Sequence, residues 1–533
     1  MRALFITIIF NFFVFSISAC NIWALVFQDD LGKDINLQCP PERVVSIVPS
    51  MTEIIVALGA EDTLQAVTYH STLPPGVVNK DIVGGFFSPS ITAIEAHAPE
   101  VIFASPLQEN VRRYFSAKDC QVITLKTESI ADSYKEILLL GTIFDTQDKA
   151  HAVVSKIQDE LELIRNKTDQ IPEPAKKRVI RLMGRDTVMT PGEDSFQNKM
   201  IRLAGGIPPR FGKTGSIVSV SQEEWQAFNP QVIYGCGGDR EVAQKFFSEP
   251  GWKDVEAVQN GQIYWFPCDL TCRAATNTGY FVSWLAATIY AQAFSRPENL
   301  IREQKVNRFR PINLDLGFVT KAGIASSRIY DFINKSLIID LKKPMAVVST
   351  LEGQREGILH VGNHFSPPPC WMIGHTQGLQ GVRSRVFATI GLSEKDSSIL
   401  FTGADMDNLS VQEETYQDMH VYALVTAGVR SNAVRMSRDE GRFYEPGTGT
   451  INILIMGNMR LSPRAMTRAI ISATEAKTAA LLDMDVRSAY SPLQYRATGT
   501  GTDNVLVVQG AGRLLHNAGG HSKLGELIAK AVY

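Results

Sequence analysis

In the first 300 positions, short apolar runs alternate with stretches of helical periodicity. The segment 44–59 predicts a buried strand, a turn around Pro49 and a helix capped by Ser50 or Thr52. Two further short strands are predicted, at 98–105 and 120–126. Because strands and helices alternate, we expect a parallel sheet covered by helices on both faces.

A long amphipathic helix is predicted from 148 to 165. Its apolar residues recur on one helical face: Ala150, Val153, Val154, Ile157, Leu161 and Ile164. A second strand-and-helix unit follows, with strands predicted at 177–184, 230–238 and 261–267. Two α/β lobes joined by one long helix form a cleft with little room for a large hinge motion.

The last 240 residues have a different pattern. The stretch 296–316 is charged, contains two prolines and lacks clear periodicity, so we expect it to be an interdomain linker. Strands are then predicted at 345–351, 398–405, 420–429, 450–458 and 504–510, and helices at 463–483 and 522–532. The expected organisation is a bilobed α/β domain at 41–295 and a mixed α/β domain of underived topology at 317–533.

Composition supports more than one domain and gives no sign of a polyanionic partner. A chain of 533 residues exceeds what one hydrophobic core usually organises. It carries 53 basic and 55 acidic residues, a formal net charge of −2. Such a balance gives no global field that attracts nucleic acid, so we expect none as a partner.

The N-terminus has the pattern of a secretory signal at residues 1–20. Arg2 precedes an apolar run at 3–14, which is too short for a comfortable membrane span. The segment 17–20 resembles the lipobox of bacterial lipoproteins, which implies lipidation of Cys20 and a membrane anchor. Ordinary signal cleavage nearby is the alternative. With either cleavage, we expect the mature protein outside the cytoplasm, in the periplasm or attached to a membrane.

Six cysteines follow Cys20, and five of them lie in the N-terminal half: Cys39, Cys120, Cys236, Cys268 and Cys272. An oxidising compartment permits disulfides, and a bridge from Cys236 to Cys268 or Cys272 is the preferred one. Six cysteines allow 15 full connectivities, so sequence alone leaves the pairing open. Zinc binding by Cys268 and Cys272 is less favoured, because no second pair with suitable spacing accompanies them.

The N-terminal half resembles the cobalamin-binding proteins of ABC importers over roughly 43–294. The resemblance rests on VVSIVPSMTEIIVALGAED, VTYHSTLPP, APEVIFA and TPGEDSFQNKMIRLAGG. It implies two rigid lobes that bind a corrinoid, a wide apolar ring rimmed by amides. It also implies contacts to the ligand from Tyr69, Phe86, Phe87, Asp269 and Arg273.

These residues also have structural interpretations. A tyrosine after a strand is usually a core residue, and Asp269 and Arg273 have the i,i+4 spacing of a surface ion pair. The chain departs from the family pattern at Ile217, where relatives have a cleft tryptophan. The family docks on its transporter through one glutamate from each lobe. Glu223 matches one docking position, whereas the other falls on Thr92, with Glu95 three residues away.

The C-terminal part, from about 345 to 533, resembles the adenosylcobinamide amidohydrolase family. The residues that carry the resemblance are TAGVRSNA, GTINILI, ATEAKTAALLD, ATGTGTD and GGHSKLGELIAKAV. It implies hydrolysis of the aminopropanol amide of incomplete corrinoids, leaving cobyric acid. The corrinoid is then both the ligand of the first domain and the substrate of the second, and no other cofactor is called for.

Amide hydrolysis needs a base, donors for the oxyanion and an acid for the departing amine. Glu475 is our candidate base, because the alanines around it suggest burial; a solvated ion pair is the alternative. The candidates for holding the carbonyl or the substrate are Asn432 and the glycine-rich loop of Thr498, Thr500, Thr502 and Asp503. That loop has the simpler interpretation of a turn into a strand.

His521 precedes a helix and is either the acid or a residue that caps the helix start. Asn363 and His364 are weaker candidates. His360 and His364 have i,i+4 spacing, but the segment is predicted to be extended, so a metal site is not favoured. Cys370 lies in PPPC without an evident activating neighbour, which makes it a weak candidate nucleophile.

From the sequence we therefore expect a secreted, bifunctional protein that captures corrinoids for import through ABC-transporter membrane subunits and hydrolyses adenosylcobinamide. The alternatives are a transport receptor with an inactive or binding-only C-terminal domain, and an iron–siderophore receptor on the same scaffold, because fold alone does not fix the ligand.

Overall fold

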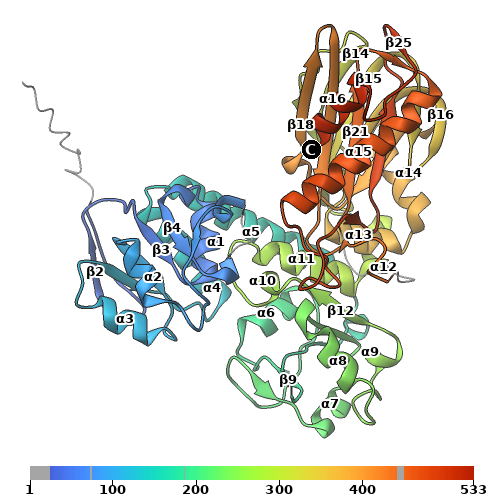
Figure 1. The fold of residues 1–533 in the computed structure, drawn as a ribbon. Helices are drawn as coiled ribbons and strands as arrows, with labels where there is room; N and C mark the ends of the chain where they lie inside the picture. Colours follow the sequence, from blue (N-terminus) through green and yellow to red (C-terminus); the bar gives the residue numbers. More distant parts are fainter. Residues whose placement is uncertain (1–23, 72–74, 185, 441–448) are drawn as a thin grey trace, which may run out of the picture. The chain divides into compact units, whose positions relative to one another are not determined.

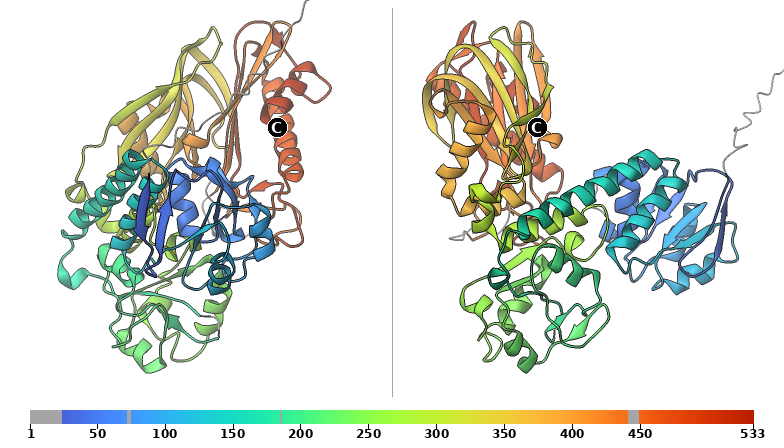
Figure 2. Two further views of the ribbon diagram at one scale, coloured as in Figure 1. Left: turned by 90° about the vertical axis from the view of Figure 1, so that its left-hand side faces the viewer. Right: turned by 180° about the vertical axis from the view of Figure 1, so that it is seen from behind.

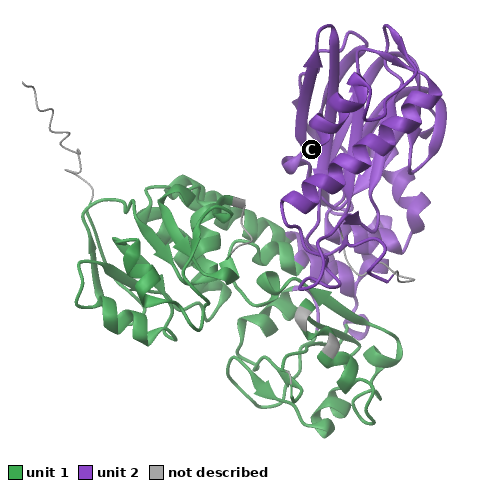
Figure 3. Ribbon diagram, in the orientation of Figure 1, with its two compact units in different colours: residues 1–162, 177–203, 207–282 green, residues 163–176, 204–206, 283–533 purple. Residues whose placement is uncertain are grey.

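The computed structural model describes residues 24–71, 75–184, 186–440 and 449–533 (Figure 1). The chain divides into two compact units (Figure 3). The first comprises residues 1–162, 177–203 and 207–282, and the second comprises residues 163–176, 204–206 and 283–533. The predicted signal, with Cys20, lies outside the described residues.

The first lobe of unit 1 is a five-stranded parallel sheet, with strand order β5-β4-β3-β6-β7. The strands are β3 (Val44–Ser46), β4 (Leu64–Val67), β5 (Asp81–Ile82), β6 (Val101–Ala104) and β7 (Gln121–Thr124). The helices are α1 (Pro49–Ala57), α2 (Ile91–Ala96), α3 (Glu109–Phe115) and α4 (Ile130–Ile143). Buried clusters lie on both faces of the sheet, as the strand–helix alternation predicts.

A short hairpin, β1 (Leu25–Gln28) and β2 (Asp34–Leu37), was not predicted and belongs to this lobe. Helix α5 (Gln147–Thr168) follows α4 and confirms the predicted long helix. Its residues from Leu163 onward belong to the second unit.

The second lobe of unit 1 has a smaller parallel sheet, with order β12-β11-β8. All three strands were predicted: β8 (Val179–Arg181), β11 (Val232–Cys236) and β12 (Ile263–Phe266). Its helices are α6 (Phe196–Leu203), α7 (Gln222–Phe228), α8 (Arg240–Phe246), α9 (Glu256–Gln259), α10 (Cys268–Thr271) and the start of α11 (Thr278–Ile289). A two-stranded antiparallel sheet of β9 (Met189–Thr190) and β10 (Val218–Ser219) completes it.

Unit 2 is built around a nine-stranded mixed sheet. One layer contains β15 (Phe332–Ser349), β24 (Asn504–Val508), β21 (Ile451–Gly457), β19 (Met419–Ala427) and β18 (Ser410–Tyr416). The remaining strands are β13 (Val306–Pro311), β14 (Val319–Ile329), β16 (Gly353–Phe365) and β17 (Ser397–Thr402). Two strand layers are visible in Figure 2, with the orange-to-red helices outside one of them.

Alternation along β21 explains these layers. Ile451, Ile453 and Ile455 pack in one core with α15 (Pro463–Asp483) and α16 (Lys523–Val532). Leu454 and Met456 point the other way, into a core formed with β14, β16 and β17. The central strands are therefore buried on both faces.

The expected linker at 296–316 is instead part of unit 2. Strand β13 pairs antiparallel with β14, and Leu314 and Leu316 are buried in the core shared with β14. The charged residues that suggested a linker alternate on an exposed edge strand, a position where charge opposes edge-to-edge association.

A buried ion pair holds the last turn of α5 in unit 2. The Lys167 ammonium donates to Asp331 Oδ2 at 2.5 Å and to the Asn299 carbonyl at 2.8 Å. Both charged side chains are fully buried. Asp331 Oδ1 accepts two further backbone N–H groups, from Ile301 and Arg302. The ion pair therefore joins α5 to the segment that precedes β13.

Replacing Lys167 by methionine is expected to lower the free energy of unfolding of unit 2 by about 3–5 kcal/mol, because Asp331 then remains buried without a cation. Urea unfolding followed by circular dichroism measures this change. The control Lys156→Met removes an exposed lysine from the same helix, and its effect should stay within about 0.5 kcal/mol. Equal effects of the two substitutions would contradict the assignment.

Candidate functional site

Three aromatic residues predicted to contact a ligand lie together on the first lobe. Phe87 and Tyr69 are 81% and 56% exposed, and the rings of Phe86 and Phe87 meet edge to face at 4.9 Å. The Tyr69 ring lies against Gly85, where a Cβ atom would approach the Tyr69 hydroxyl to 2.5 Å. Any larger residue at position 85 would require the Tyr69 ring to move. The result is an exposed aromatic surface, which suits a broad apolar ligand.

Arg273 of the second lobe lies beside this surface. Its Nη2 donates to the His70 carbonyl at 2.9 Å, and its Nη1 lies 3.8 Å from a carboxylate oxygen of Glu53. Glu53 is buried on α1 and accepts hydrogen bonds from the Thr276 hydroxyl and from both nitrogens of Asn277. The sequence analysis missed Glu53. The available signal was a carboxylate within an otherwise apolar helix.

Electrostatics connects these groups. Burial raises the pKa of Glu53, the Arg273 charge opposes this rise, and nearby Asp269 adds to it. Burial and the Arg273 charge lower the pKa of His70, whose Nδ1 accepts the Phe86 N–H at 3.1 Å. The structure thus brings Asp269 and Arg273 together with the segments that carry Tyr69 and Phe86.

The expected docking residues are both exposed. Glu223 lies in the first turn of α7. Glu95, on α2, pairs with Lys118 at 2.8 Å and accepts the Tyr114 hydroxyl at 2.8 Å, and these hydrogen bonds hold its pKa below the usual value. Any partner that uses Glu95 must therefore displace Lys118. Ile217, the departure from the family pattern, is 52% exposed.

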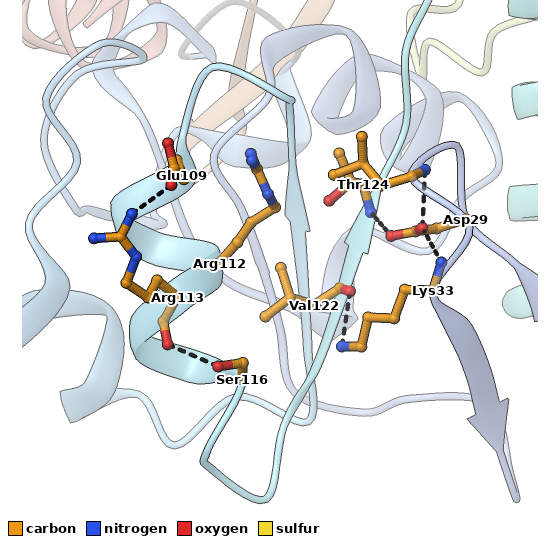
Figure 4. A pocket seen from close by; sticks show the side chains of 9 residues that line it. Asp29, Lys33, Glu109, Arg112, Arg113, Ser116, Val122 and Thr124 are labelled. Atoms are coloured by element: carbon orange, nitrogen blue, oxygen red, sulfur yellow. Dashed lines mark hydrogen bonds and ion pairs between the residues drawn. The ribbon is translucent and has the colours of Figure 1, made fainter.

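A separate hollow of about 290 Å³ lies on the first lobe between α3 and β7 (Figure 4). Its basic side chains are already engaged: Lys33 donates to the Val122 carbonyl, Arg113 pairs with Glu109, and Arg112 donates to two backbone carbonyls. None of the predicted ligand residues lines it. We therefore assign no ligand to this hollow.

In unit 2, Asn432 and the glycine-rich loop, two separate candidates from the sequence, lie side by side. Strand β20 (Ala433–Val434) pairs antiparallel with β23 (Gly499–Thr500), which brings buried Asn432 next to the loop. The Asn432 Nδ2 group donates to the Gly449 carbonyl at 3.0 Å. A Cβ atom at position 501 would lie 3.2 Å from Asn432 Oδ1, so a glycine there lets the amide lie over the loop backbone.

Asp503 is the centre of this loop. Its Oδ1 accepts the Thr500 hydroxyl at 2.5 Å and the Ile451 N–H at 3.1 Å, and both of its oxygens lie 3.1 Å from the Thr500 nitrogen. The Lys477 ammonium, from α15, pairs with Oδ2. These donors occupy the carboxylate, so Asp503 fixes the loop and has little capacity left to act as a base. Lys477 was missed in the sequence analysis.

A buried amide ladder lies at the same end of the sheet. Asn363 Nδ2 donates to the Thr426 hydroxyl at 2.9 Å, and Asn452 Nδ2 donates to Asn363 Oδ1 at 2.8 Å. Thr426 and Asn452 are direct neighbours across β19 and β21, and Asn452 pairs with Asn504, the residue after Asp503. The ladder therefore connects the two strand layers beside the loop.

Two predicted catalytic residues do not join this group. Glu475 was expected to be buried, which is wrong: it is exposed on α15. Two positions along an α-helix are about 200° apart, so Glu475 faces away from Lys477, which contacts the loop. Ala473, Ala476 and Ala480 are buried because of their positions around the helix, whereas Ala479 is exposed like Glu475.

His521 is also exposed, in the turn before α16. Two residues later, the Lys523 ammonium lies 4.5 Å above the Tyr416 ring, at the hairpin end of β18 and β19. The glycine-rich loop lies at the opposite end of β19, where Ala427 pairs with Ile451. The structure therefore does not bring His521 to the loop.

His364 lies on the face of β16 opposite to Asn363. Its Nδ1 lies 2.8 Å from the Ser336 hydroxyl and its Nε2 lies 3.0 Å from the Ser366 hydroxyl. The imidazole is fully buried, and burial lowers its pKa to about 3. It is therefore neutral near pH 7 and forms a structural Ser–His–Ser bridge on the far side of the strand from the loop.

This burial predicts a pH dependence of stability. The folded pKa of about 3 lies below the unfolded value of about 6.5, so the unfolded state binds more protons between these values. The free energy of unfolding should therefore fall as the pH drops from about 6.5 towards 3, by a few kcal/mol in total. Urea unfolding of wild type and His364→Gln measures this, and the variant should lose less stability between pH 7 and 5. If the free energies of unfolding of the two proteins fell in parallel with pH, His364 would not be the cause of the pH dependence.

The other candidates in unit 2 lie apart from the loop. His360 pairs with Asp340 at 2.7 Å and does not converge with His364. Cys370 is buried, and burial raises its pKa to about 12, which disfavours a nucleophilic thiolate. Within the described ranges, no group of three or more His, Cys, Asp or Glu side chains is placed to hold a metal ion.

The expected disulfide is not formed. All six cysteines from Cys39 to Cys370 are free thiols, although the sulfur atoms of Cys236 and Cys272 lie 3.6 Å apart. Among the helices of the described residues, none is both long enough and apolar enough to cross a membrane.

Comparison with known proteins assigns the two halves of the chain separately. A sequence model of the adenosylcobinamide amidohydrolase family matches residues 321–533. An adenosylcobinamide amidohydrolase of Methanosarcina mazei is 33% identical over 185 residues, which cover 33% of this chain and 75% of the relative. The chain belongs to the adenosylcobinamide amidohydrolase family. An uncharacterised protein of Methanocaldococcus jannaschii is 41% identical over 214 residues, covering 37% of this chain and 82% of the relative.

In the N-terminal half, a sequence model of the periplasmic binding protein family matches residues 44–270. A vitamin B12-binding protein of Vibrio cholerae serotype O1 is 25% identical over 247 residues, covering 45% of this chain and 86% of the relative. The amidohydrolase-family chain thus carries a bilobed α/β domain in front of its mixed α/β domain, and the matches agree with both resemblances expected from the sequence.

Proposed function

We propose that this chain captures corrinoids with its N-terminal domain and hydrolyses the aminopropanol amide of adenosylcobinamide with its C-terminal domain, giving adenosylcobyric acid. The observation that carries the proposal is the pairing of matches: one half resembles a vitamin B12-binding protein and the other an adenosylcobinamide amidohydrolase. The same class of molecule is then the ligand of one domain and the substrate of the other.

The geometry of unit 1 supports a corrinoid ligand. Exposed Tyr69 and Phe87, with partly buried Phe86, offer flat apolar contacts for the ring. Arg273 and Asp269 are the polar groups beside this surface that suit peripheral amides. Glu53 and the His70 carbonyl hold the Arg273 side chain, so it is positioned before a ligand arrives.

The geometry of unit 2 supports binding of an amide at the Asn432 side of the glycine-rich loop. Asn432 can polarise a carbonyl, and backbone N–H groups of a loop that contains two glycines, Gly499 and Gly501, can approach an oxyanion closely. Asp503, Thr500 and Lys477 act as positioning residues, because their mutual hydrogen bonds fix the loop. We do not include Glu475 or His521 in this site.

The location and partners follow from the binding-domain family. We propose that the chain acts outside the cytoplasm, with Cys20 as its lipid attachment site, and delivers corrinoid to the membrane subunits of an ABC importer. Glu223 and Glu95 are the proposed docking residues, with the Glu95–Lys118 pair opening on contact. No nucleic acid partner is proposed.

Incubation of the purified full-length chain with adenosylcobinamide, followed by chromatography and mass spectrometry, tests the enzymatic part. We expect formation of adenosylcobyric acid and aminopropanol. Calorimetric titration with cobinamide and with a ferric siderophore tests the binding part, and cobinamide should bind more tightly. Tight corrinoid binding without product would favour a pure receptor, and siderophore preference would overturn the ligand assignment.

A further inference from the structure

The second lobe of unit 1 contains a buried arginine surrounded by thiols, outside the aromatic surface described above. Arg181 ends β8 and is 1% exposed. Its Nη2 lies 3.1 Å from the sulfur of Cys272 and 3.5 Å from that of Cys236, while Nη1 donates to the Thr271 carbonyl at 2.9 Å. Cys268 is near enough to affect the pKa of both of the other thiols.

Arg181 has no carboxylate to balance its charge. None of the ion pairs found among the described residues involves it, and its Nε is buried without a partner. A guanidinium stays protonated in proteins, and a buried charge without a counter-ion is costly. Nearby Tyr234 cannot supply the anion, because burial raises the pKa of its hydroxyl. The nearest group that can ionise towards Arg181 is the Cys272 thiol.

The titration of the thiols agrees with this geometry. Hydrogen bonds from Cys236 and Cys268, together with the Arg181 charge, hold the pKa of Cys272 below its usual value. Hydrogen bonds with Cys268 and Cys272, together with burial, raise the pKa of Cys236. The pair therefore combines one thiolate and one protonated thiol, with sulfur atoms 3.6 Å apart.

We propose that Cys272 is a reactive thiolate which exchanges with disulfide oxidants, such as oxidised glutathione or a thiol oxidoreductase, and passes the bond to Cys236. The Cys272 thiolate attacks one sulfur of the oxidant and releases its other half as a thiolate. Cys236 then loses its proton and attacks the mixed disulfide at Cys272, releasing the second half. Two protein thiols are oxidised to one disulfide, and the oxidant is reduced to two thiols.

Arg181 also makes the bond easy to reduce. Forming it removes the thiolate and leaves the buried guanidinium without its counter-ion, so the reduced form is the favoured one. The sulfur atoms must move from 3.6 Å to about 2.05 Å to form the bond. The site is therefore a reversible redox pair, unlike the structural bridge that cysteine spacing alone suggested.

Alkylation by iodoacetamide at pH 6, resolved by peptide mass spectrometry, tests the thiolate. Ordinary thiols with a pKa of about 8.5 are about 0.3% ionised at pH 6, so Cys272 should react at least about 10-fold faster than exposed Cys39. In a folded Arg181→Met variant, the ratio of the Cys272 alkylation rate to the Cys39 rate should fall to about 1. If that variant does not fold, the rates in wild type decide whether Cys272 is a thiolate. Equal rates for Cys39 and Cys272 in wild type would overturn the thiolate.

Oxidised glutathione tests the exchange on the same full-length chain. We expect a Cys236–Cys272 bond, no bond in Cys272→Ser, and an unchanged bond in the control Cys39→Ser. Reduced glutathione should reverse it. A bond from Cys268 to either partner, or no bond in wild type, would overturn the assignment of the pair.

The bond also has a consequence that rests on the proposed corrinoid function. Cys268 and Cys272 flank Asp269 and adjoin Arg273 on one short segment, so oxidation should change the affinity for cobinamide by about 3-fold or more. Calorimetry on reduced and oxidised protein measures this. Equal affinities with the bond in place would overturn the coupling, whereas no binding in either state would overturn the proposed ligand.

Discussion

Substitution of Asp503 by asparagine should lower kcat/KM for adenosylcobinamide hydrolysis by about 100-fold or more, because small misplacements of a site have effects of this size. Asparagine can keep Oδ1 as the acceptor of the Thr500 and Ile451 donors. Its Nδ2 group then replaces Oδ2, donates towards the Lys477 ammonium instead of accepting from it, and leaves Lys477 without its anion. Loss of this partly buried pair should also cost about 2–4 kcal/mol of stability. Steady-state kinetics and urea unfolding measure the two effects.

The matched control for this change is Asp485→Asn. Asp485 pairs with Arg487 and Arg496 on the surface of the same unit and is 49% exposed, so its effect on stability should be within about 0.5 kcal/mol. Circular dichroism must show that Asp503→Asn is folded under the assay conditions. A folded Asp503→Asn protein with kcat/KM within twofold of wild type would remove the loop from the proposed site.

The double substitution Tyr69→Ala and Phe87→Ala should weaken corrinoid binding by about 30- to 1,000-fold, equivalent to about 2–4 kcal/mol of lost aromatic contact. Both rings are exposed in the structure, so the folded protein should lose little stability. Isothermal titration with cobinamide measures the affinity. Hydrolysis at saturating substrate should continue, because the proposed amide site lies in the other unit.

Leu107→Ala is the control for this pair. Leu107 is 71% exposed on the same lobe and was not assigned to the ligand surface, so the affinity for cobinamide should stay within twofold of wild type. If Leu107→Ala and the double substitution weaken binding equally, the aromatic surface is not the corrinoid site.

Hydrophobic periodicity was sufficient to predict a helix or strand where the capping residues and the packing of that element agreed with it. Helix α15 has the predicted bounds, 463–483, because Ser462 caps it, Pro463 occupies its first turn and its apolar stripe packs on the sheet. The five predicted strands of the C-terminal domain all exist. The long strands β14 and β16 were missed. Their alternation is weak, and in β15 the register shifts next to Lys342 and Lys343.

In the candidate sites, contacts between residues far apart in the sequence can be identified only from the three-dimensional structure. Sequence proposed Asn432 and the glycine-rich loop as separate candidates, and the pairing of β20 with β23 brings them together. Sequence could not reveal that Lys477 neutralises Asp503 or that Glu53 meets Asn277, since each partner comes from a distant segment. The burial of Glu475 was predicted wrongly from the small size of its neighbours. Burial on a helix depends instead on which side of the helix a residue faces.

The place of β13 and Lys167 in unit 2 determines how the protein can be divided. A fragment that starts at 317, where composition places the boundary, would lack β13, expose the edge of β14 and leave Asp331 without its ammonium partner. Inserting a protease site between 295 and 296 should likewise not release an independently stable enzyme. The last turn of α5 therefore contributes to the folding of the hydrolase-family unit, so the two domains share one helix and cannot be separated at the boundary that composition suggests.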